Sequence, residues 1–419
     1  MRMKQGSLAL IALLLSAPAQ AGDDVESLKQ LVRELAQRVN DLEDRLAAKE
    51  SSRQIVQGFE MPAAAKPLPK PIATPDRMVS SGNDKVKLTV SGQVSRAVLY
   101  ANNGQRSRFF HVDNDNGSTR FQLKGVAKVA PEWEIGAQIQ AQIESNSTVD
   151  VDIGKDAASS TVNFTERIMD VFFVTPAGKF TLGQGPTSSD GISEIDLSGT
   201  NIIGDGASLE EFAGGITFRK AARPDGTTGP RIRDVWNSLD GLGRRDRIRY
   251  DTPSILGFVL GMTHADGDSN DVSLKFQGDF DGHILKAGAA WAKRRKMYNQ
   301  YNAGVSFLMP CGVSLTGAAA VRMRTALNTD PKVQMAFGKL GYQHKWLECG
   351  KTATAVDYGE TRNGDQQGDK IRSWGVYVVQ HIDPAATELY LGYRRHSLSR
   401  PGYVFNTINA AMFGARVKF

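Results

Sequence analysis

The 419-residue sequence predicts an all-β fold, a 16-stranded antiparallel transmembrane β-barrel over residues 85–419, preceded by a short N-terminal coiled-coil helix. Three observations support this prediction. Segments of about ten residues alternate apolar with polar side chains, as barrel strands between lipid and a wet lumen do. The connections between these segments alternate between short and long. Beyond the first 21 residues, no uncharged apolar stretch approaches the length of a transmembrane helix.

The first 21 residues have the pattern of a secretory signal peptide. Arg2 and Lys4 precede an apolar run from Leu8 to Leu15, and Ala19-Gln20-Ala21 supplies the small residues of a cleavage site. An N-terminal membrane anchor is the alternative, but the run is far shorter than the roughly 20 residues that a spanning helix needs. We therefore expect a mature chain that begins at Gly22 outside the cytoplasm.

Residues 22–50 predict a coiled coil. Apolar residues recur there at alternating spacings of three and four, the seam of a heptad repeat: Val25, Leu28, Val32, Leu35, Val39, Leu42 and Leu46. An isolated helix of this length is marginal in water, so partner helices are expected. A helix packed on its own globular domain is the alternative.

The heptad core and a short motif favour different numbers of strands. Val at the a positions with Leu at the d positions favours two strands. Arg38, Val39, Leu42 and Glu43 instead resemble the motif of three-stranded parallel coiled coils. The prediction of a trimer depends on that motif. Residues 51–84 follow, with prolines at 62, 67, 69, 71 and 75, and predict an extended, semi-rigid linker.

From Lys85 onward the apolar period changes to two. The clearest segment begins at Trp133 and places Ile135, Ala137, Ile139, Ala141 and Ile143 on one face and five glutamine or glutamate side chains on the other. A soluble β-sandwich also has alternating strands, but the strand length favours a barrel. The pattern predicts sixteen strands, centred near residues 90, 123, 138, 169, 182, 249, 261, 275, 288, 305, 317, 337, 355, 377, 390 and 413.

The connections predict which end of the barrel is which. Short turns such as Thr175-Pro176-Ala177-Gly178 and Met309-Pro310-Cys311-Gly312 alternate with longer polar stretches at 101–117, 146–161 and 359–370. Cys311 and Cys349 lie in two neighbouring short turns. In an oxidising compartment they could form a disulfide, and two free thiols are the alternative.

Four sequence motifs resemble the general trimeric porins of Gram-negative outer membranes. They begin at Ser118-Thr119-Arg120-Phe121, Gly178-Lys179-Phe180, Arg249-Tyr250-Asp251-Thr252-Pro253 and the terminal Gly414 to Phe419. The N-terminal coiled coil is similar to that of DcaP-like porins, which take up small organic anions such as dicarboxylates. The resemblance implies a homotrimer in the outer membrane, with the coiled coil in the periplasm and passive diffusion of small hydrophilic solutes through the barrel.

The resemblance also implies that the segment of about 186–244 folds inward and narrows the pore. It is acidic on its own terms, because no Lys or Arg occurs from Phe180 to Phe218. We expect its carboxylates to face a basic wall and set a transverse field across the constriction. An ordinary solvated acidic loop is the alternative. The predicted acidic residues are Asp190, Glu194, Asp196, Asp205, Glu210 and Glu211. The predicted basic wall is Arg96, Arg120, Lys124, Arg167, Arg247, Arg249 and Lys286.

Charge predicts a weak to moderate anion preference, because residues 85–419 carry 40 Lys and Arg against 34 Asp and Glu. Small anionic solutes, outer-membrane lipid and lipopolysaccharide are the expected partners. Alternative functions are a selective channel for organic anions such as dicarboxylates, a tether from the outer membrane to peptidoglycan through the coiled coil, and an enzymatic barrel. No nucleophile motif, metal-ligand spacing or cofactor motif supports catalysis, and the basic runs do not indicate nucleic acid.

Overall fold

The computed structural model describes residues 37, 85–155, 162–221, 228–324 and 331–419. The chain divides into two compact units, residues 1–72 and 73–419. In the first unit only Gln37 is described, and it is helical and exposed. The predicted signal peptide, the coiled-coil motif Arg38, Val39, Leu42 and Glu43, and the linker lie outside the described residues. Among the described residues, no helix combines the length and apolar character that a bilayer crossing requires.

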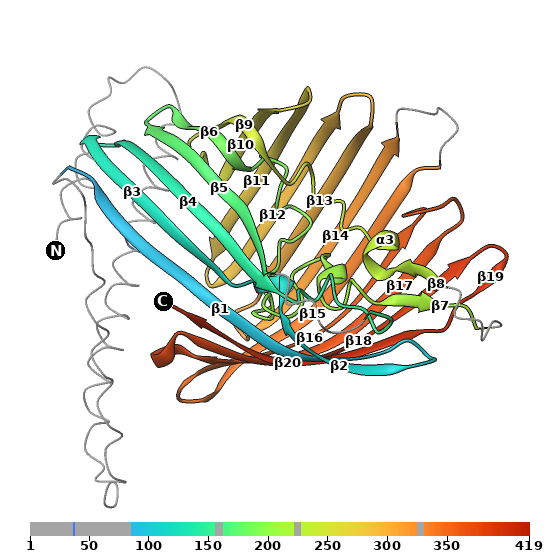
Figure 1. The fold of residues 1–419 in the computed structure, drawn as a ribbon. Coiled ribbons are helices and arrows are strands. Elements are labelled where there is room, and N and C mark those ends of the chain that lie inside the picture. Colours follow the sequence, from blue (N-terminus) through green and yellow to red (C-terminus); the bar gives the residue numbers. More distant parts are fainter. Residues whose placement is uncertain (1–36, 38–84, 156–161, 222–227, 325–330) are drawn as a thin grey trace, which may run out of the picture. The chain divides into compact units, whose positions relative to one another are not determined.

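The described part of the second unit folds into one antiparallel sheet of 18 strand segments (Figure 1). The segments are β1 (Lys87–Asn102), β2 (Ser107–Asp113), β3 (Arg120–Ala130), β4 (Trp133–Ser145), β5 (Val162–Thr175), β6 (Gly178–Pro186), β9 (Arg244–Asp251), β10 (Phe258–Ala265), β11 (Ser269–Phe280), β12 (His283–Arg294), β13 (Tyr298–Leu308), β14 (Val313–Arg324), β15 (Val333–Leu347), β16 (Gly350–Arg362), β17 (Lys370–Ile382), β18 (Thr387–Arg400), β19 (Tyr403–Val404) and β20 (Ile408–Lys418).

These 18 segments make 16 strands, because two strands are interrupted. β2 and β3 pair with the two halves of β1, and the short 3-10 turn η1 (Asp115–Gly117) separates them. In the same way β19 and β20 both pair with β18. Along the described chain each strand pairs with the next, and β20 pairs with β1 and closes the barrel. The predicted 16-stranded antiparallel barrel is therefore confirmed, and all sixteen predicted strand centres fall within strands.

The short turns gather at the end of the barrel that also holds the last residues of the chain. The backbone nitrogen of Lys418 donates to the carbonyl of Ala386, in the turn between β17 and β18, at 3.0 Å. At the opposite end, two expected loops are shorter than predicted because the strands continue into them. β1 and β2 extend into 101–117, and β16 and β17 reduce the loop predicted at 359–370 to residues 363–369.

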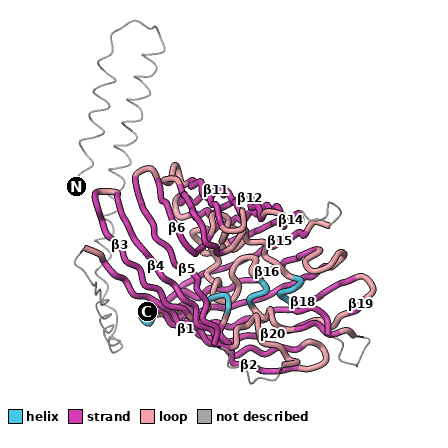
Figure 2. The backbone as a smooth tube through the Cα atoms, turned by 45° about the horizontal axis from the view of Figure 1, so that its top comes forward, coloured by secondary structure: helices cyan, strands magenta, loops and turns pink. Residues whose placement is uncertain are grey.

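The long segment between β6 and β9 lies inside the barrel (Figures 1 and 2). It contains η2 (Leu209–Glu211), the hairpin β7 (Thr217–Arg219) and β8 (Thr228–Arg231), and the helix α3 (Ile232–Val235). Its apolar side chains form one buried cluster with residues of β14 to β18 and β20, and burial of apolar area stabilises this position. The segment's buried members include Ile202, Ile203, Leu209, Phe212, Ile216, Phe218, Ile232, Val235 and Trp236. This segment, residues 187–243, which we call the inner loop, therefore fills one side of the lumen.

A glycine on the wall allows the inner loop to approach closely. A Cβ atom on Gly304 of β13 would clash with the backbone carbonyl of Ile192. We expect Gly304→Ala to displace the inner loop from the wall, because overpacking destabilises the contact between them by about 1–3 kcal/mol. The displacement should raise the single-channel conductance. Gly317→Ala, on the neighbouring strand, is the matched control, because a Cβ atom there meets its nearest atoms at ordinary contact distances of 3.8 and 4.0 Å. Planar-bilayer recordings check this, and equal conductance in the two variants would contradict it.

Candidate pore constriction

Arginines of β9 fix the point where the inner loop leaves the wall. Arg249 donates to the carbonyls of Pro186 and Thr187 at 3.1 and 3.0 Å. Arg247 donates to Pro186 at 2.9 Å and forms a buried ion pair with Asp170 of β5 at 2.9 Å. These contacts orient the first residues of the loop into the lumen.

Asp271 of β11 binds the next residues of the loop. Its carboxylate accepts hydrogen bonds from the hydroxyls of Ser188 and Ser189 at 2.7 and 2.5 Å, and from the Ser189 backbone at 3.1 Å. All three residues are buried. Charge-assisted hydrogen bonds of this kind are stronger than neutral ones, so the loop is held at its base as well as by its apolar face.

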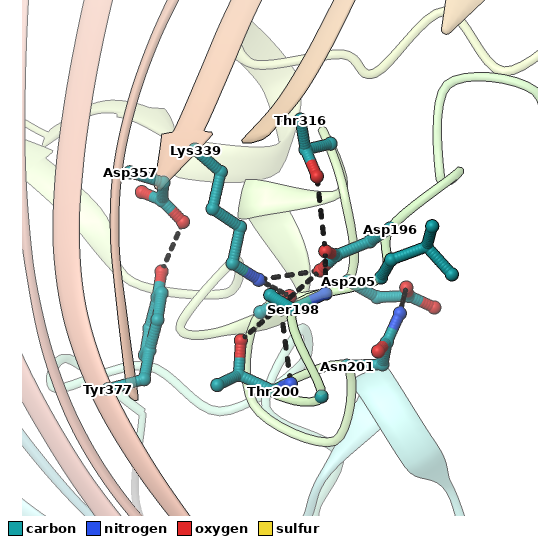
Figure 3. Close-up of polar contacts among 12 residues, drawn as sticks. Asp196, Ser198, Thr200, Asn201, Asp205, Thr316, Lys339, Asp357 and Tyr377 are labelled. Atoms are coloured by element: carbon teal, nitrogen blue, oxygen red, sulfur yellow. Dashed lines mark hydrogen bonds and ion pairs between the residues drawn. The ribbon is translucent and has the colours of Figure 1, made fainter. Parts of the chain in front are cut away.

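Lys339 of β15 holds the middle of the loop (Figure 3). Its ammonium lies 2.7 Å from Asp196 and 2.6 Å from the carbonyl of Gly204, and both side chains of the ion pair are fully buried. The Asp196 carboxylate also accepts hydrogen bonds from Ser198 and Thr316, at 2.9 and 3.4 Å. The sequence analysis predicted Asp196 to line the constriction, but its carboxylate instead attaches the inner loop to the barrel wall.

A second buried ion pair lies on the wall beside this seat. Arg394 of β18 donates to Asp357 of β16 at 2.7 and 2.8 Å. Tyr377 of β17 donates to the same carboxylate at 2.7 Å (Figure 3). The Arg394 guanidinium also lies 6.0 Å from the ring centroid of Phe212 in the loop. This polar group sits under the apolar side of the loop and fixes its position along the wall.

A cavity of about 660 Å³ remains between the loop and the wall formed by β3 to β9. Three arginines line it, Arg120 of β3, Arg167 of β5 and Arg244 of β9, together with six carboxyl groups and four uncharged polar side chains. The carboxyl groups belong to Asp115, Glu166, Asp190, Glu194, Asp205 and Glu211. Lys275 of β11 adds a cation beside Asp190, whose carbonyl accepts its hydrogen bond at 3.0 Å. Guanidinium groups thus face carboxyl groups across an open space.

A β-bulge accounts for the position of Arg167. Gln140 pairs with Ile168 and Ala141 with Glu166, so Arg167 has no opposite residue and the alternation of β5 shifts there. The freed guanidinium donates to the side-chain oxygen of Gln142, which is on the lumen face of β4. Bulges often redirect a side chain next to a functional site, and this one brings a third arginine into the cavity.

Burial raises the pKa of three carboxyl groups of the inner loop. It raises the pKa of Asp205 to about 8, and the charge of Glu194 adds to the effect. Burial, followed by repulsion from Asp190, raises the pKa of Glu194. Burial together with the charges of Asp115 and Glu194 holds the pKa of Glu211 well above its usual range. The acidic side of the cavity therefore carries less than its full negative charge at neutral pH, whereas the arginines keep theirs.

The structure relocates several residues of the predicted basic wall. Arg96 is on the outer face of β1, between Val94 and Val98, and its guanidinium donates to Ser145 at 2.8 Å and lies 3.6 Å from Asp113. It does not line the lumen, because the alternation of β1 turns even-numbered residues outward. This corrects the prediction.

The remaining predicted cations face inward but lie away from the cavity. Lys124 lies 5.3 Å from the ring centroid of Phe172, and Lys286 pairs in register with Ser306 of β13. Arg247 and Arg249 hold the base of the loop. Of the seven predicted cations, Arg120 and Arg167 are thus the two that line the cavity.

Four of the six predicted acids line the cavity, Asp190, Glu194, Asp205 and Glu211. The Glu210 carboxyl group instead accepts a hydrogen bond from the backbone nitrogen of Ser238, and burial raises its pKa to about 7. The sequence analysis missed Arg244, Asp115 and Glu166. Arg244 is the first residue of the basic run 244–247, which could have identified it, whereas Asp115 is in an interruption of the strand pattern.

Cys311 and Cys349 are free thiols, so the disulfide considered from the sequence is absent from the structure. Cys349 lies within 3.7 Å of the side-chain nitrogen of Gln380. Within the described ranges, no group of three or more His, Cys, Asp or Glu side chains is arranged to hold a metal ion.

A closed antiparallel barrel narrowed by an inward loop defines a membrane channel of the porin class. The family model described as Gram-negative porin matches residues 62–400, so this chain belongs to the Gram-negative porin family and is an outer-membrane channel protein. Family and fold point to a channel rather than an enzyme. No curated protein matches the chain by sequence.

Solved porin structures share the fold at low sequence identity. An anion-selective porin from Comamonas acidovorans is 17% identical with a TM-score of 0.55, and the match covers 80% of this chain and 100% of that one. OmpT of Vibrio cholerae in its trimer form is 13% identical with a TM-score of 0.52, and the match covers 80% of this chain and 100% of that one. The outer-membrane channel DcaP of Acinetobacter baumannii is 11% identical with a TM-score of 0.51, and the match covers 80% of this chain and 98% of that one.

Proposed function

We propose that this porin is a homotrimeric passive diffusion channel for small hydrophilic solutes and that it prefers anions at neutral pH. The observation that carries the proposal is the cavity in which Arg120, Arg167 and Arg244 face carboxyl groups of the inner loop. Fully ionised, the six carboxyl groups would outnumber the three arginines. Burial raises the pKa of Glu194, Asp205 and Glu211, which lowers the negative charge of the loop and shifts the balance toward the cations.

Two further observations support the proposal. The solved neighbours include the anion-selective porin from Comamonas acidovorans and OmpT of Vibrio cholerae in its trimer form. The excess of Lys and Arg over residues 85–419 also favours anion entry through the field of the whole barrel. The tether hypothesis stays a prediction, because the linker and all of the coiled coil except Gln37 lie outside the described residues.

The arginine group also favours organic dianions as solutes. Guanidinium groups bind carboxylates through two parallel hydrogen bonds, and three of them line one cavity. We therefore propose dicarboxylates of the size of succinate as solutes that bind during passage. Inorganic anions such as chloride would pass without saturation.

The test is the zero-current potential of the purified protein in a planar bilayer under a KCl gradient, repeated with succinate. We expect a potential of the sign for chloride preference, and a saturable reduction of the chloride current by succinate. A potential of the opposite sign would contradict the anion preference. Chloride preference without block by succinate would retain the general channel and exclude selective binding of the dianion.

The raised pKa values predict that selectivity depends on pH. Asp205, whose pKa burial raises to about 8, is mostly neutral at lower pH and ionises as the pH rises through that value. The added negative charge opposes the arginines, so we expect the ratio of chloride to potassium permeability to fall about three- to tenfold between about pH 6 and about pH 9. Zero-current potentials at the two pH values measure this.

The double variant Asp205→Asn/Glu211→Gln is the control for the pH dependence. It removes two of the titrating groups and should keep a high chloride preference across the same range. A pH dependence as steep as that of the unmodified protein would show that other groups cause it.

A further inference from the structure

A second cavity, of about 590 Å³, lies at the external end of the barrel; we call it the mouth pocket. Three segments bound it: the hairpin of β7 and β8, the loop between β16 and β17, and residues 400–405 around β19. The hairpin and β19 lie side by side at this end in Figure 1. The mouth pocket shares no lining residue with the constriction cavity, so the proposed channel function does not use it.

Backbone contacts attach the hairpin to the segment that contains β19. The backbone nitrogen of Ala221 donates to the carbonyl of Val404 at 2.9 Å. Gly229 of β8 lies directly against Phe405, because a Cβ atom on this glycine would come within 2.5 Å of the ring. The walls of the pocket are therefore formed without a ligand, and a preformed site lowers the ordering cost of binding.

Two aromatic rings form the apolar part of the mouth pocket. The ring centroids of Tyr403 and Phe405 are 6.2 Å apart. Phe405 packs on the buried apolar cluster, where its ring centroid lies 6.2 Å from that of Phe218. Tyr403 is 50% exposed, and the ammonium group of Lys220 lies 4.2 Å from its ring centroid. The pocket therefore offers a ligand an aromatic surface that is anchored on one side and open on the other.

The charges of the lining balance one another. The charged lining residues are Lys220, Arg400, Asp234 and Asp365, so the formal charges sum to zero. Arg231 donates to both oxygens of Asp234 at 3.0 Å, and Arg400 donates to Asp365 at 2.7 Å. An anion would meet these carboxylates as well as the cations, and an apolar ligand would bury polar groups without partners. The balance favours an uncharged polar ligand.

The lining also has donors and acceptors that remain free. The Arg400 side chain is only 10% exposed, yet its Nη1 makes no hydrogen bond to another described residue. Among the described residues, the same holds for the side-chain amide of Gln366, for Asp365 Oδ1, and for the hydroxyls of Thr228 and Tyr403. A hydroxyl group both donates and accepts, so a ligand with several hydroxyls can use all of these groups.

We propose that the mouth pocket binds a neutral saccharide of disaccharide size. A sugar ring presents C–H bonds on its faces, which suit the negative face of an aromatic ring such as Tyr403. Its hydroxyls suit the mixed donors and acceptors of Arg400, Asp365 and Gln366. The pocket volume falls within the range of about 300–1,000 Å³ that is typical of small-ligand sites. Such a site holds the sugar at the external mouth and does not depend on the proposed anion preference.

The test is saturation-transfer NMR of the purified full-length protein with maltose, cellobiose, lactose and sucrose, each titrated to give an affinity. The detergent must carry no sugar headgroup, because an alkyl maltoside would itself occupy the site. We expect saturable binding of at least one of the four disaccharides. Absence of saturable binding for all four would overturn the proposal.

Tyr403→Leu removes the aromatic surface but keeps an apolar side chain. It is expected to weaken sugar binding about three- to tenfold. Tyr301→Leu is the matched control, because Tyr301 of β13 is equally exposed, at 49%, and does not line the pocket. The control should bind the sugar as the unmodified protein does. Equal affinity of Tyr403→Leu and the unmodified protein would contradict the proposed stacking and overturn the site.

Gln366→Ala gives the decisive measurement if Tyr403→Leu does not fold. Gln366 is an exposed loop residue whose side chain makes no hydrogen bond within the described part of the chain, so its replacement should leave the fold intact. We expect about two- to fivefold weaker sugar binding from the loss of its hydrogen bonds to the ligand. An unchanged affinity would overturn the proposal.

Benzoate tests whether the pocket prefers an aromatic acid. It has a flat ring and a carboxylate but no hydroxyl group, so it should not displace the sugar. Displacement by benzoate at the affinity of the sugar would overturn the proposal, because it would show a site for aromatic anions.

Crossed variants separate the mouth pocket from the channel function. Tyr403→Leu should keep the chloride preference of the unmodified protein, and Arg167→Gln/Arg244→Gln should keep its sugar affinity, because the two cavities share no lining residue. Loss of sugar binding in the arginine variant would place the sugar in the constriction cavity and overturn the proposal. A cation-selective unmodified protein that still binds sugar would contradict the anion preference and leave the mouth pocket supported.

Discussion

Replacing Arg167 and Arg244 together by glutamine is expected to turn an anion-preferring channel into a cation-preferring one. The change leaves Arg120 as the one arginine among the residues that line the cavity, opposite six carboxyl groups. The local field of a constriction decides which ions pass, so the loss of two fixed charges acts directly on permeation. We expect the ratio of chloride to potassium permeability to fall on the order of tenfold and to cross unity. Zero-current potentials in a KCl gradient measure it.

Lys286→Gln provides the control for this reversal. It removes a cation on the lumen face of β12 that does not line the cavity. If the local field at the cavity decides selectivity, this variant should keep the original chloride preference. A loss as large as that of the Arg167 and Arg244 variant would contradict the assignment, because it would mean that the total charge of the lumen decides.

Replacing Lys339 by methionine is expected to release the inner loop from the wall. Asp196 would keep a fully buried carboxylate without its cation, and breaking a buried ion pair from one side costs about 3–5 kcal/mol. Gly204 would also lose the hydrogen bond that its carbonyl accepts from Lys339. We expect larger and noisier single-channel currents and faster proteolysis of the loop. The barrel should stay closed, because its strand pairing does not involve the ion pair.

The double variant Lys339→Met/Asp196→Asn separates the charge effect from the loss of packing. Neutralising both partners removes the uncompensated buried charge, so most of the loop's stability should return. Single-channel recordings and limited proteolysis of the three proteins form the comparison. Equal behaviour of Lys339→Met and the unmodified protein would show that the ion pair does not hold the loop.

The barrel could be predicted from the sequence because its information is local. A strand that separates lipid from a wet lumen must alternate its side chains, and this period locates each strand without knowledge of its neighbours. The same alternation does not predict the direction of a side chain where a strand is irregular. The bulge at Arg167 is set by pairing with β4, and the break at Asp115 by η1. Both residues nonetheless line the cavity.

The roles of the loop acids could not be predicted from the sequence. Asp190 and Asp196 are six residues apart in a segment without a regular period. Asp190 lines the cavity, whereas Asp196 is buried because Lys339, more than one hundred residues later, lies opposite it. Contacts of that separation are set by the closed barrel. Arg96 was misplaced for a different reason. Its outward direction follows from the alternation of β1, but it depends on which of the two alternating sets of side chains on that strand faces the lumen.

Anomalous diffraction from crystals of the protein soaked in bromide, and separately in rubidium, tests most directly whether the arginines make the cavity an anion site. We expect a bromide peak in the cavity within contact distance of Arg120, Arg167 or Arg244, and no rubidium peak there, at neutral pH. Rubidium bound among Asp190, Glu194 and Asp205, with no bromide at the arginines, would contradict the proposed anion preference.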